Sequence, residues 1–284
     1  MWRSLLYVPV TSERFVASAH TRGADAIILE LEDGVAPSEK DRARQLVADA
    51  APIAGQSGAD VLVRINRPWR LAVRDIEASV RADVCGLVLP KVDSADHVRA
   101  LADVVDDVER EMGLAVGSTV FFLRIESAQG VLNAAEIACA HPRVVALGLG
   151  VGDFSLSLGV AHNSLTVAIA AYNIVVAAAA AGRVPLGLAS SITNFADPEE
   201  FRSAVTEARR LGFRGAPCVH PSQVPILNEI FSPTPEEHEQ AREIISEYEL
   251  ALADGVGAIT TSSGLFVDIP VYEHAKRTLA QTSP

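Results

Sequence analysis

The sequence predicts an α/β fold, a TIM (β/α)8 barrel followed by a C-terminal helix–flap–helix extension. Short apolar runs of β type alternate with helical segments over residues 1–231, and together they make eight βα units. Polar residues also follow five consecutive strand-like runs, at the ends where α/β folds carry their chemistry. A doubly wound open sheet is the competing architecture, but no G-x-G-x-x-G follows the first strand-like run.

The elements of the barrel are expected in strict alternation. Strands are predicted at residues 4–10, 26–31, 61–66, 86–90, 120–125, 144–149, 185–192 and 216–220. Helices are predicted at residues 12–21, 38–50, 71–80, 94–112, 131–140, 164–181, 198–211 and 221–231. Strand-like runs of this kind are apolar on both faces, which is typical of parallel strands covered by helices.

Residues 232–284 are expected to form a separate extension that serves as a lid or an oligomer contact. A charged helix is predicted at 235–254 and a last helix at 269–279. Between them, residues 255–268 predict a two-stranded flap with its turn at 262–264. The boundary between barrel and extension is therefore placed between residues 231 and 232.

Composition excludes some classes of function. The chain has 24 Lys and Arg against 36 Asp and Glu, a net charge of −12, which argues against binding to nucleic acid. Its three cysteines, Cys85, Cys139 and Cys218, contain no C-x-x-C pair and are expected to be reduced, which favours a cytoplasmic location. No signal peptide is expected, and the alanine-rich run 167–181 is too short for a membrane span.

Two carboxylates follow neighbouring predicted strands. Glu126 comes after the strand at 120–125, and Asp153 follows the strand at 144–149. Carboxylate oxygens converging from adjacent parallel strands are a hard site for Mg²⁺, so both residues are predicted metal ligands. The alternative is that each only caps the helix that follows it.

Further charged residues end the neighbouring strands. Arg64 either pairs with Glu32 or holds a carboxylate or enolate oxygen of the substrate. Lys91 is either a surface lysine or a second substrate contact. Glu32 and Asp33 are expected to hold metal-bound waters or to orient Arg64. Arg124 shares a strand face with Glu126, and an inward arginine in a barrel needs a partner.

These groups predict a chemistry. A divalent cation and an arginine together hold a 2-oxo acid by its carboxylate and carbonyl, and the cation acts as a Lewis acid on the carbonyl. This arrangement favours making or breaking a carbon–carbon bond at the neighbouring carbon, through an enolate.

The motifs resemble those of a known family. The matching runs are R-S-L-L-Y-V-P (3–9), G-A-D-A-I-I-L-E-L-E-D-G-V-A-P-S-E-K-D-R-A-R (23–44), V-R-I-N (63–66), L-P-K-V (89–92), I-E-S-A-Q-G-V (125–131), G-V-G-D-F (150–154) and H-P-S-Q-V (220–224). In this order they are similar to the citrate lyase beta-subunit-like group, which includes malyl-CoA lyases, within the phosphoenolpyruvate/pyruvate barrel superfamily.

The resemblance implies a TIM barrel with Mg²⁺ on Glu126 and Asp153, and with Arg64 and Glu126 at the substrate. It also implies a homotrimer or hexamer in which the C-terminal flap closes over a neighbour's site. The run F-V-D-I-P (266–270) matches the flap segment, so Asp268 is the predicted general acid or base, acting in trans. The alternative for Asp268 is a helix N-cap before Pro270.

The sequence departs from the family pattern at one acidic position and at several positions that are usually basic. The usual D-L-E-D is Glu30-Leu31-Glu32-Asp33 here, and the usual glycine-lysine before the histidine-proline motif is Gly215-Ala216. The segment 171–182 lacks its usual arginines, and the first helix lacks its common lysine. Because CoA phosphates bind to basic residues, this thinning weakens the expectation of a CoA ester.

The leading prediction is a Mg²⁺-dependent carbon–carbon lyase that cleaves or forms a 3-hydroxy acyl-CoA such as malyl-CoA or citramalyl-CoA. Three alternatives remain: a CoA-independent 2-oxo-acid aldolase, an acyl-CoA thioesterase, and a non-catalytic barrel that binds a ligand.

Overall fold

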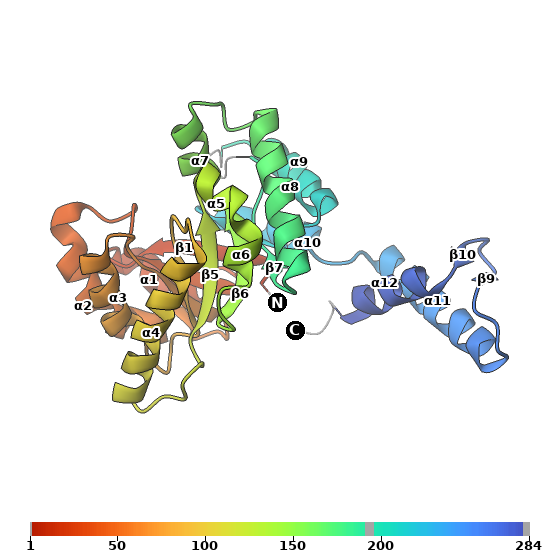
Figure 1. The fold of residues 1–284 in the computed structure, drawn as a ribbon, viewed down its shortest axis with the longest axis horizontal. Coiled ribbons are helices and arrows are strands. Elements are labelled where there is room, and N and C mark those ends of the chain that lie inside the picture. Colours follow the sequence, from red (N-terminus) through yellow and green to blue (C-terminus); the bar gives the residue numbers. More distant parts are fainter. Residues whose placement is uncertain (1, 191–195, 281–284) are drawn as a thin grey trace. The chain divides into compact units, whose positions relative to one another are not determined.

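Eight parallel strands form the centre of the protein, in a computed structural model that describes residues 2–190 and 196–280 (Figure 1). The strands are β1 (Ser4–Pro9), β2 (Ala26–Glu30), β3 (Asp60–Arg64), β4 (Gly86–Leu89), β5 (Val120–Ile125), β6 (Val144–Leu149), β7 (Val184–Pro185) and β8 (Ala216–Cys218). Their order is β7-β6-β5-β4-β3-β2-β1-β8, so each strand lies beside its neighbour in the chain and β8 returns to β1. The predicted α/β barrel is confirmed.

Helices follow the strands and cover the outside of the sheet. They are α1 (Glu13–Ala19), α2 (Lys40–Ala54), α3 (Trp69–Ser79), α4 (Ala95–Glu111), α5 (Ala128–Leu132), α6 (Ala134–Ala138), α7 (Val151–Leu158), α8 (Leu165–Ala180), α9 (Pro198–Leu211) and α10 (Val224–Ile230), with short 3-10 turns η1 (Pro37–Glu39) and η2 (Pro221–Gln223). In the described residues, no helix combines the length and the apolar character that crossing a bilayer requires.

The inside of the barrel is filled by one side chain from each of several strands. Leu5, Ile28, Leu62, Val88 and Phe122 are fully buried and pack together there. Each contributes about 1.5–3 kcal/mol to folding by leaving water. Because successive residues of a strand point to opposite faces, residues two positions further along these strands also point inward, toward the C-terminal end of the barrel. Tyr7, Glu30, Arg64 and Arg124 stand at those positions.

The seam between β7 and β8 differs from the other strand boundaries. β7 covers only Val184–Pro185, so the strand predicted over 185–192 is confirmed at Pro185 and was wrong at 186–190, and residues 191 and 192 lie outside the described residues. After Pro185, successive backbone amides donate to opposite neighbours. Leu186 N–H donates to Leu147 O in β6, and Gly187 N–H donates to Gly215 O, just before β8. The bond at Gly187 and a bond from Arg214 N–H to Pro185 O cross the seam, so the barrel closes here without a regular ladder.

Two helical segments differ from expectation. The helix predicted at 131–140 is interrupted at Asn133, which separates α5 from α6. The side-chain amide of Asn133 donates a hydrogen bond to Asp93 O. Helix α7 was not predicted, because its first residues, V-G-D, follow directly on Gly150 and carry two weak helix formers.

The chain folds into two compact units, one formed by Trp2–Glu229 and one that begins at Ile230. The second unit contains α11 (Pro235–Ala253), a flap of β9 (Ile259–Thr260) and β10 (Phe266–Val267), and α12 (Ile269–Ala280). Its core centres on Tyr248, which is fully buried and packs on Tyr272. The predicted helix–flap–helix order is confirmed.

Candidate active site

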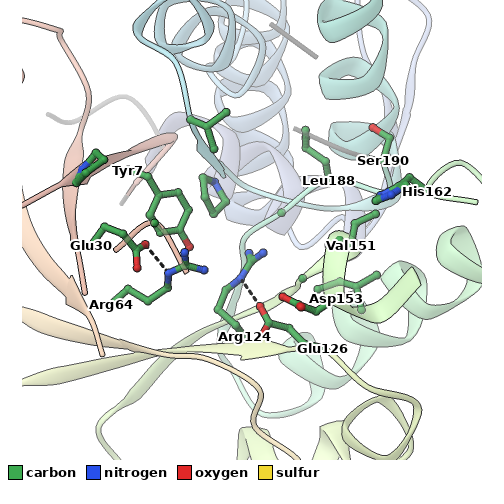
Figure 2. A pocket seen from close by; sticks show the side chains of 18 residues that line it. Tyr7, Glu30, Arg64, Arg124, Glu126, Val151, Asp153, His162, Leu188 and Ser190 are labelled. Carbon is green, nitrogen blue, oxygen red and sulfur yellow. Dashed lines mark hydrogen bonds and ion pairs between the residues drawn. The ribbon is translucent and has the colours of Figure 1, made fainter. Parts of the chain in front are cut away.

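A cavity of about 340 Å³ opens at the C-terminal ends of the strands, and it collects inward side chains from β1, β2, β3 and β5 (Figure 2). Its polar lining includes Tyr7, Glu30, Arg64, Arg124 and Glu126. The C-terminal mouth of a (β/α)8 barrel is where such enzymes carry their reacting groups. The cavity therefore marks the candidate active site.

Glu126 is held rigidly directly after β5. Its carboxylate is buried, and its Oε2 accepts a hydrogen bond of 3.0 Å from the peptide N–H of Lys91. Lys91 has φ +52°, a left-handed conformation that is uncommon outside glycine and marks a position held by its surroundings. On the other side the carboxylate lies against bare backbone, because a Cβ at Gly150 would be only 2.2 Å from Oε1.

The surroundings of Glu126 shift its ionisation. Burial raises the pKa of Glu126 to about 7; the positive charge of Arg124 acts against this rise, whereas the negative charges of Glu32 and Asp153 add to it. A bound cation beside this carboxylate would relieve both the burial cost and the repulsion from the neighbouring acids.

Asp153 lies beside Glu126 in the cavity (Figure 2). It belongs to the first turn of α7, so it does not simply end a strand as the sequence suggested. In the described residues, no group of three or more His, Cys, Asp or Glu side chains forms a cation cage. Mg²⁺ needs no such cage, since it is commonly bound by one or two carboxylates with water and substrate oxygens completing its octahedron. The pair of carboxylates fits Mg²⁺.

Arg64, at the end of β3, is oriented by three neighbours. Its Nε lies 2.5 Å from Glu30 Oε2, and its Nη1 lies 3.1 Å from Glu32 Oε2. The guanidinium carbon sits 4.7 Å from the centre of the Tyr7 ring, a cation–π distance. Both alternatives for Arg64 are therefore compatible with its position: it pairs with Glu32, and it also faces the cavity.

Glu32, Asp33 and Lys91 form a group of ion pairs next to the cavity rather than in its lining. Lys91 Nζ lies 2.7 Å from Glu32 Oε1 and 3.1 Å from Asp33 Oδ2. Partial burial lowers the pKa of Lys91, but the hydrogen bond and charge of Glu32 outweigh this effect, so the pKa is raised. Substrate contact by the Lys91 ammonium stays a prediction, while its peptide N–H holds Glu126.

A buried network fixes the segment that carries Glu32. Asn66 Nδ2 and Lys40 Nζ both donate to Leu31 O. Asn66 is in turn held by the fully buried Asp75, which also binds Arg44 Nε at 2.6 Å. Satisfied buried charges of this kind prevent the loop from adopting alternatives that would leave them unpaired.

Asp268 belongs to the second unit, the one that begins at Ile230. It precedes α12, and its Oδ1 accepts a hydrogen bond of 3.3 Å from Val271 N–H. This contact corresponds to the N-cap alternative for the residue. A catalytic role in trans stays a prediction.

Sequence reasoning did not assign a role to three residues of the cavity. Tyr7 and Arg124 line it from β1 and β5, and His162 lines it from the segment between α7 and α8 (Figure 2). Tyr7 and Arg124 could have been identified from the sequence. Each lies two residues after a core residue, Leu5 or Phe122, and therefore on the same face of its strand. His162 could not be identified in this way, since it lies outside any regular element.

The arrangement suits binding of a small oxygen-rich anion. Two carboxylates provide ligands for a hard cation, and two guanidinium groups face the same cavity. Comparison with known proteins agrees with this picture.

The family model of the HpcH/HpaI aldolase/citrate lyase family matches residues 3–221. The citrate lyase subunit beta of Leuconostoc mesenteroides subsp. cremoris is 33% identical over 278 residues, which are 98% of this chain and 92% of that protein. A (3S)-malyl-CoA thioesterase of Cereibacter sphaeroides is 34% identical over 285 residues, 99% of this chain and 94% of that protein.

Among solved structures, protein CitE of Mycobacterium tuberculosis in complex with magnesium, acetoacetate and coenzyme A superposes with a TM-score of 0.78 at 29% identity. The match covers 98% of this chain and 97% of that one. From its motifs, its fold and these matches over nearly its whole length, the chain belongs to the HpcH/HpaI aldolase/citrate lyase family.

Proposed function

We propose that this protein is a Mg²⁺-dependent carbon–carbon lyase that cleaves or forms a 3-hydroxy acyl-CoA such as malyl-CoA or citramalyl-CoA. The observation that carries the proposal is the placement of Glu126 and Asp153 side by side in a cavity that Arg64 also lines. The magnesium-bound CitE neighbour and the citrate lyase beta relative support it.

In the cleavage direction the bond between the hydroxyl-bearing carbon and the carbon next to the thioester breaks. The hydroxyl loses its proton and becomes the carbonyl of a 2-oxo acid, and the bonding electrons form the enolate of the acyl-CoA. That enolate then takes up a proton at carbon. Glu126 and Asp153 would hold a divalent cation, which would supply Lewis-acid polarisation of the substrate oxygen.

The side chains of the protein do the remaining work. Arg64, held in place by Glu30 and Glu32, presents a fixed guanidinium to the carboxylate of the substrate or to a developing enolate oxygen. Glu32 and Asp33 form ion pairs with Lys91, and these pairs fix the position of the Glu32 carboxylate that orients Arg64. Both acids also hold water near the cation site. Asp268 of a neighbouring subunit moves the proton, in a homotrimer or hexamer.

The decisive experiment measures both products of the Mg²⁺-loaded protein with malyl-CoA and citramalyl-CoA. A lyase releases acetyl-CoA with glyoxylate or pyruvate, and the thioester stays intact. Asp268→Asn should abolish this turnover while leaving binding unchanged, because the amide neither accepts nor donates the proton as a carboxyl does. Full activity of this variant would contradict the proton-transfer role.

A second candidate is an acyl-CoA thioesterase, favoured by the (3S)-malyl-CoA thioesterase relative. In that reaction water attacks the thioester carbonyl, and free CoA appears as a thiol together with malate. The same assay separates the two reactions, because only hydrolysis produces thiol in step with substrate loss.

A third candidate is a CoA-independent 2-oxo-acid aldolase. It is favoured by α8, whose residues Leu165–Ala180 include no lysine or arginine that would bind a CoA phosphate. Titration with acetyl-CoA tests it, since absence of binding beside clear binding of 2-oxo acids would favour this reaction. A barrel that binds 2-oxo acids and turns over none of these substrates would be a ligand sensor.

We also propose a cytoplasmic location, which fits the free thiols of Cys85, Cys139 and Cys218. Fractionation of cells that express the tagged full-length chain would test it, with recovery in a membrane or extracellular fraction as the contrary result.

A further inference from the structure

The direction of the Glu126 carboxylate is set in part by one backbone N–H, in the loop after β4. Lys91 N–H donates to Glu126 Oε2 at 3.0 Å. The same carboxylate lies beside Asp153 in the cavity (Figure 2). Because a carboxylate that binds a metal ion is oriented by its hydrogen-bond partners, whatever holds the Lys91 peptide also holds one ligand of the proposed metal site.

The peptide between Lys91 and Val92 is held at both of its polar groups. Val92 N–H donates to Arg124 O at 3.1 Å, and Lys91 O accepts a hydrogen bond of 3.0 Å from Arg67 Nε. Because N–H and C=O point in opposite directions in a planar trans peptide, β5 holds one side of it and Arg67 holds the other. Lys91 has φ +52°, a conformation that residues with a side chain rarely keep unless their surroundings impose it. Arg67 is therefore one of the contacts that keep the Lys91 N–H directed at Glu126.

Arg67 is mounted on a rigid support after β3. The preceding residue, Asn66, is buried, and both its N–H and its Nδ2 donate to Asp75 Oδ2. The following residue, Pro68, is the N-cap of α3, and its carbonyl accepts a hydrogen bond from Leu71 N–H. Arg67 itself is half-buried between these two fixed residues. Its Nε–H is thus presented to the Lys91 carbonyl from a backbone with little freedom.

From these contacts we propose that Arg67 is a positioning residue, whose Nε–H fixes the Lys91 peptide and thereby the direction of the Glu126 carboxylate toward Mg²⁺. The inference rests on the proposed function, which assigns Glu126 to the metal ion. Arg67 is not one of the described residues that line the cavity. It acts through Lys91 and Glu126 rather than on the substrate, so its removal weakens the metal site from outside the cavity.

Two substitutions of matched length separate the hydrogen bond of Arg67 from its charge. Arg67→Gln keeps an N–H donor at the same number of bonds from Cα as Nε, whereas Arg67→Met places a methyl group there. Calorimetric titration of the metal-free, full-length protein with Mg²⁺ should show affinity weakened about 3- to 10-fold in Arg67→Met and by less than about 2-fold in Arg67→Gln. Arg70→Met is the matched control, because Arg70 is an exposed arginine of α3, and it should leave the affinity unchanged.

The path through Glu126 is tested in two backgrounds. Adding Arg67→Met to Glu126→Gln should weaken Mg²⁺ binding by less than about 2-fold further, because the ligand that Arg67 positions is already altered. Adding it to Asp153→Asn, which leaves Glu126 in place, should retain the full weakening of about 3- to 10-fold. Hydrogen exchange gives a readout that needs no metal: the Lys91 amide should exchange about 10-fold faster in Arg67→Met than in the wild type, and at the wild-type rate in Arg67→Gln.

Three results would overturn the positioning role and leave the proposed function standing. One is Mg²⁺ affinity in Arg67→Met equal to that of the wild type. Another is equal weakening by Arg67→Met and Arg67→Gln, which would mean that the charge matters and the hydrogen bond does not. The third is a full effect of Arg67→Met in the Glu126→Gln background. If Arg67→Met does not fold, Arg67→Lys replaces it, since lysine keeps the charge and has a methylene at the position of Nε; affinity as high as in Arg67→Gln would then overturn the role. A wild type that does not bind Mg²⁺ would overturn the proposed function as well.

Discussion

At the scale of single residues, we expect Asp153 and Glu126 to determine whether the cavity binds Mg²⁺. Each contributes one carboxylate, so neither alone provides a strong site for a cation that holds most of its water. Asp153→Asn and Glu126→Gln should each weaken Mg²⁺ binding by at least about 10-fold, as measured by calorimetry. Glu229→Gln, which alters an exposed ion pair with Arg202, is the control and should leave the affinity unchanged. Unchanged Mg²⁺ binding in both cavity variants would exclude these carboxylates as ligands.

Two glycines, Gly150 and Gly152, offer a matched test of how the Glu126 carboxylate is held. A methyl group on Gly150 would meet Glu126 Oε1 at 2.2 Å, whereas a methyl group on Gly152 meets no atom within 4 Å. Gly150→Ala should therefore displace the carboxylate, lower stability by about 1–3 kcal/mol and weaken Mg²⁺ binding. Gly152→Ala should do neither. Denaturant unfolding and calorimetry give both readouts, and similar behaviour of the two variants would contradict the expectation.

At the scale of elements, α8 carries an unusual surface. Leu165, Ile169, Tyr172 and Val176 recur at helical spacing, and each is about half exposed or more within one chain. An exposed apolar stripe of this length suits contact with another subunit.

We predict that Ile169→Glu lowers the oligomeric mass measured by light scattering, since it places a charge within the apolar stripe. Ser203→Glu adds the same charge at an exposed position of α9 and should leave the mass unchanged. An unaltered oligomer in Ile169→Glu would place the subunit contact elsewhere.

For the molecule as a whole, two buried groups lower stability in acid, whereas Glu126, whose pKa is raised to about 7, acts in the opposite direction. Burial lowers the pKa of His97 to about 4, and neither ring nitrogen has a hydrogen-bond partner. Glu109 is also buried; burial raises its pKa, but its hydrogen bonds to Arg143, Thr119 and Gly117 outweigh that effect and lower it to about 2.

The shifts of His97 and Glu109 each contribute stability that is present near neutral pH and is lost in acid. The unfolded chain takes up a proton at His97 near pH 6.5 while the folded chain resists until about pH 4, so stability falls over this window. Glu109 adds a second loss between about pH 4.5 and 2. His97→Leu should remove the first loss, on the order of 1–2 kcal/mol, in urea unfolding followed from pH 7 to 4. A slope that persists in this variant would assign it to other groups.

Regular patterning made most of the barrel predictable from sequence. The strands Ala26–Glu30 and Val144–Leu149 are buried at every position except Val145, which is half-buried, and such strands can be recognised in a sequence as short, mostly apolar runs. β7 was poorly predicted because its limits depend on hydrogen bonds from Leu186 and Gly187 to Leu147 and Gly215, residues that are distant in the sequence. No local sequence pattern indicates such bonds. Helix α7 was missed for a related reason, since packing rather than propensity places V-G-D in a helix.

The candidate site was likewise predictable from the sequence only in part. Carboxylates at strand ends are conspicuous in a sequence, so Glu126 and Asp153 were identifiable as a pair that lines one cavity. The exact contacts were not, because they depend on register between strands: Lys91 N–H reaches Glu126 across β4 and β5, and Arg64 reaches Glu30 across β2 and β3. The functional environment of Tyr7 likewise exists only once the barrel is closed.

The sparse closure between β7 and β8 gives the barrel one weak boundary. Among the described residues, only two backbone hydrogen bonds cross it, at the amides of Gly187 and Arg214. Local opening is governed by such bonds, so these two amides should exchange with deuterated water sooner than amides in β2 or β5. Gly187, Leu188, Pro217 and Val219 line the cavity along this boundary. We therefore expect local opening at this boundary to widen the cavity from one side, and a ligand that fills the cavity should slow exchange at these two amides.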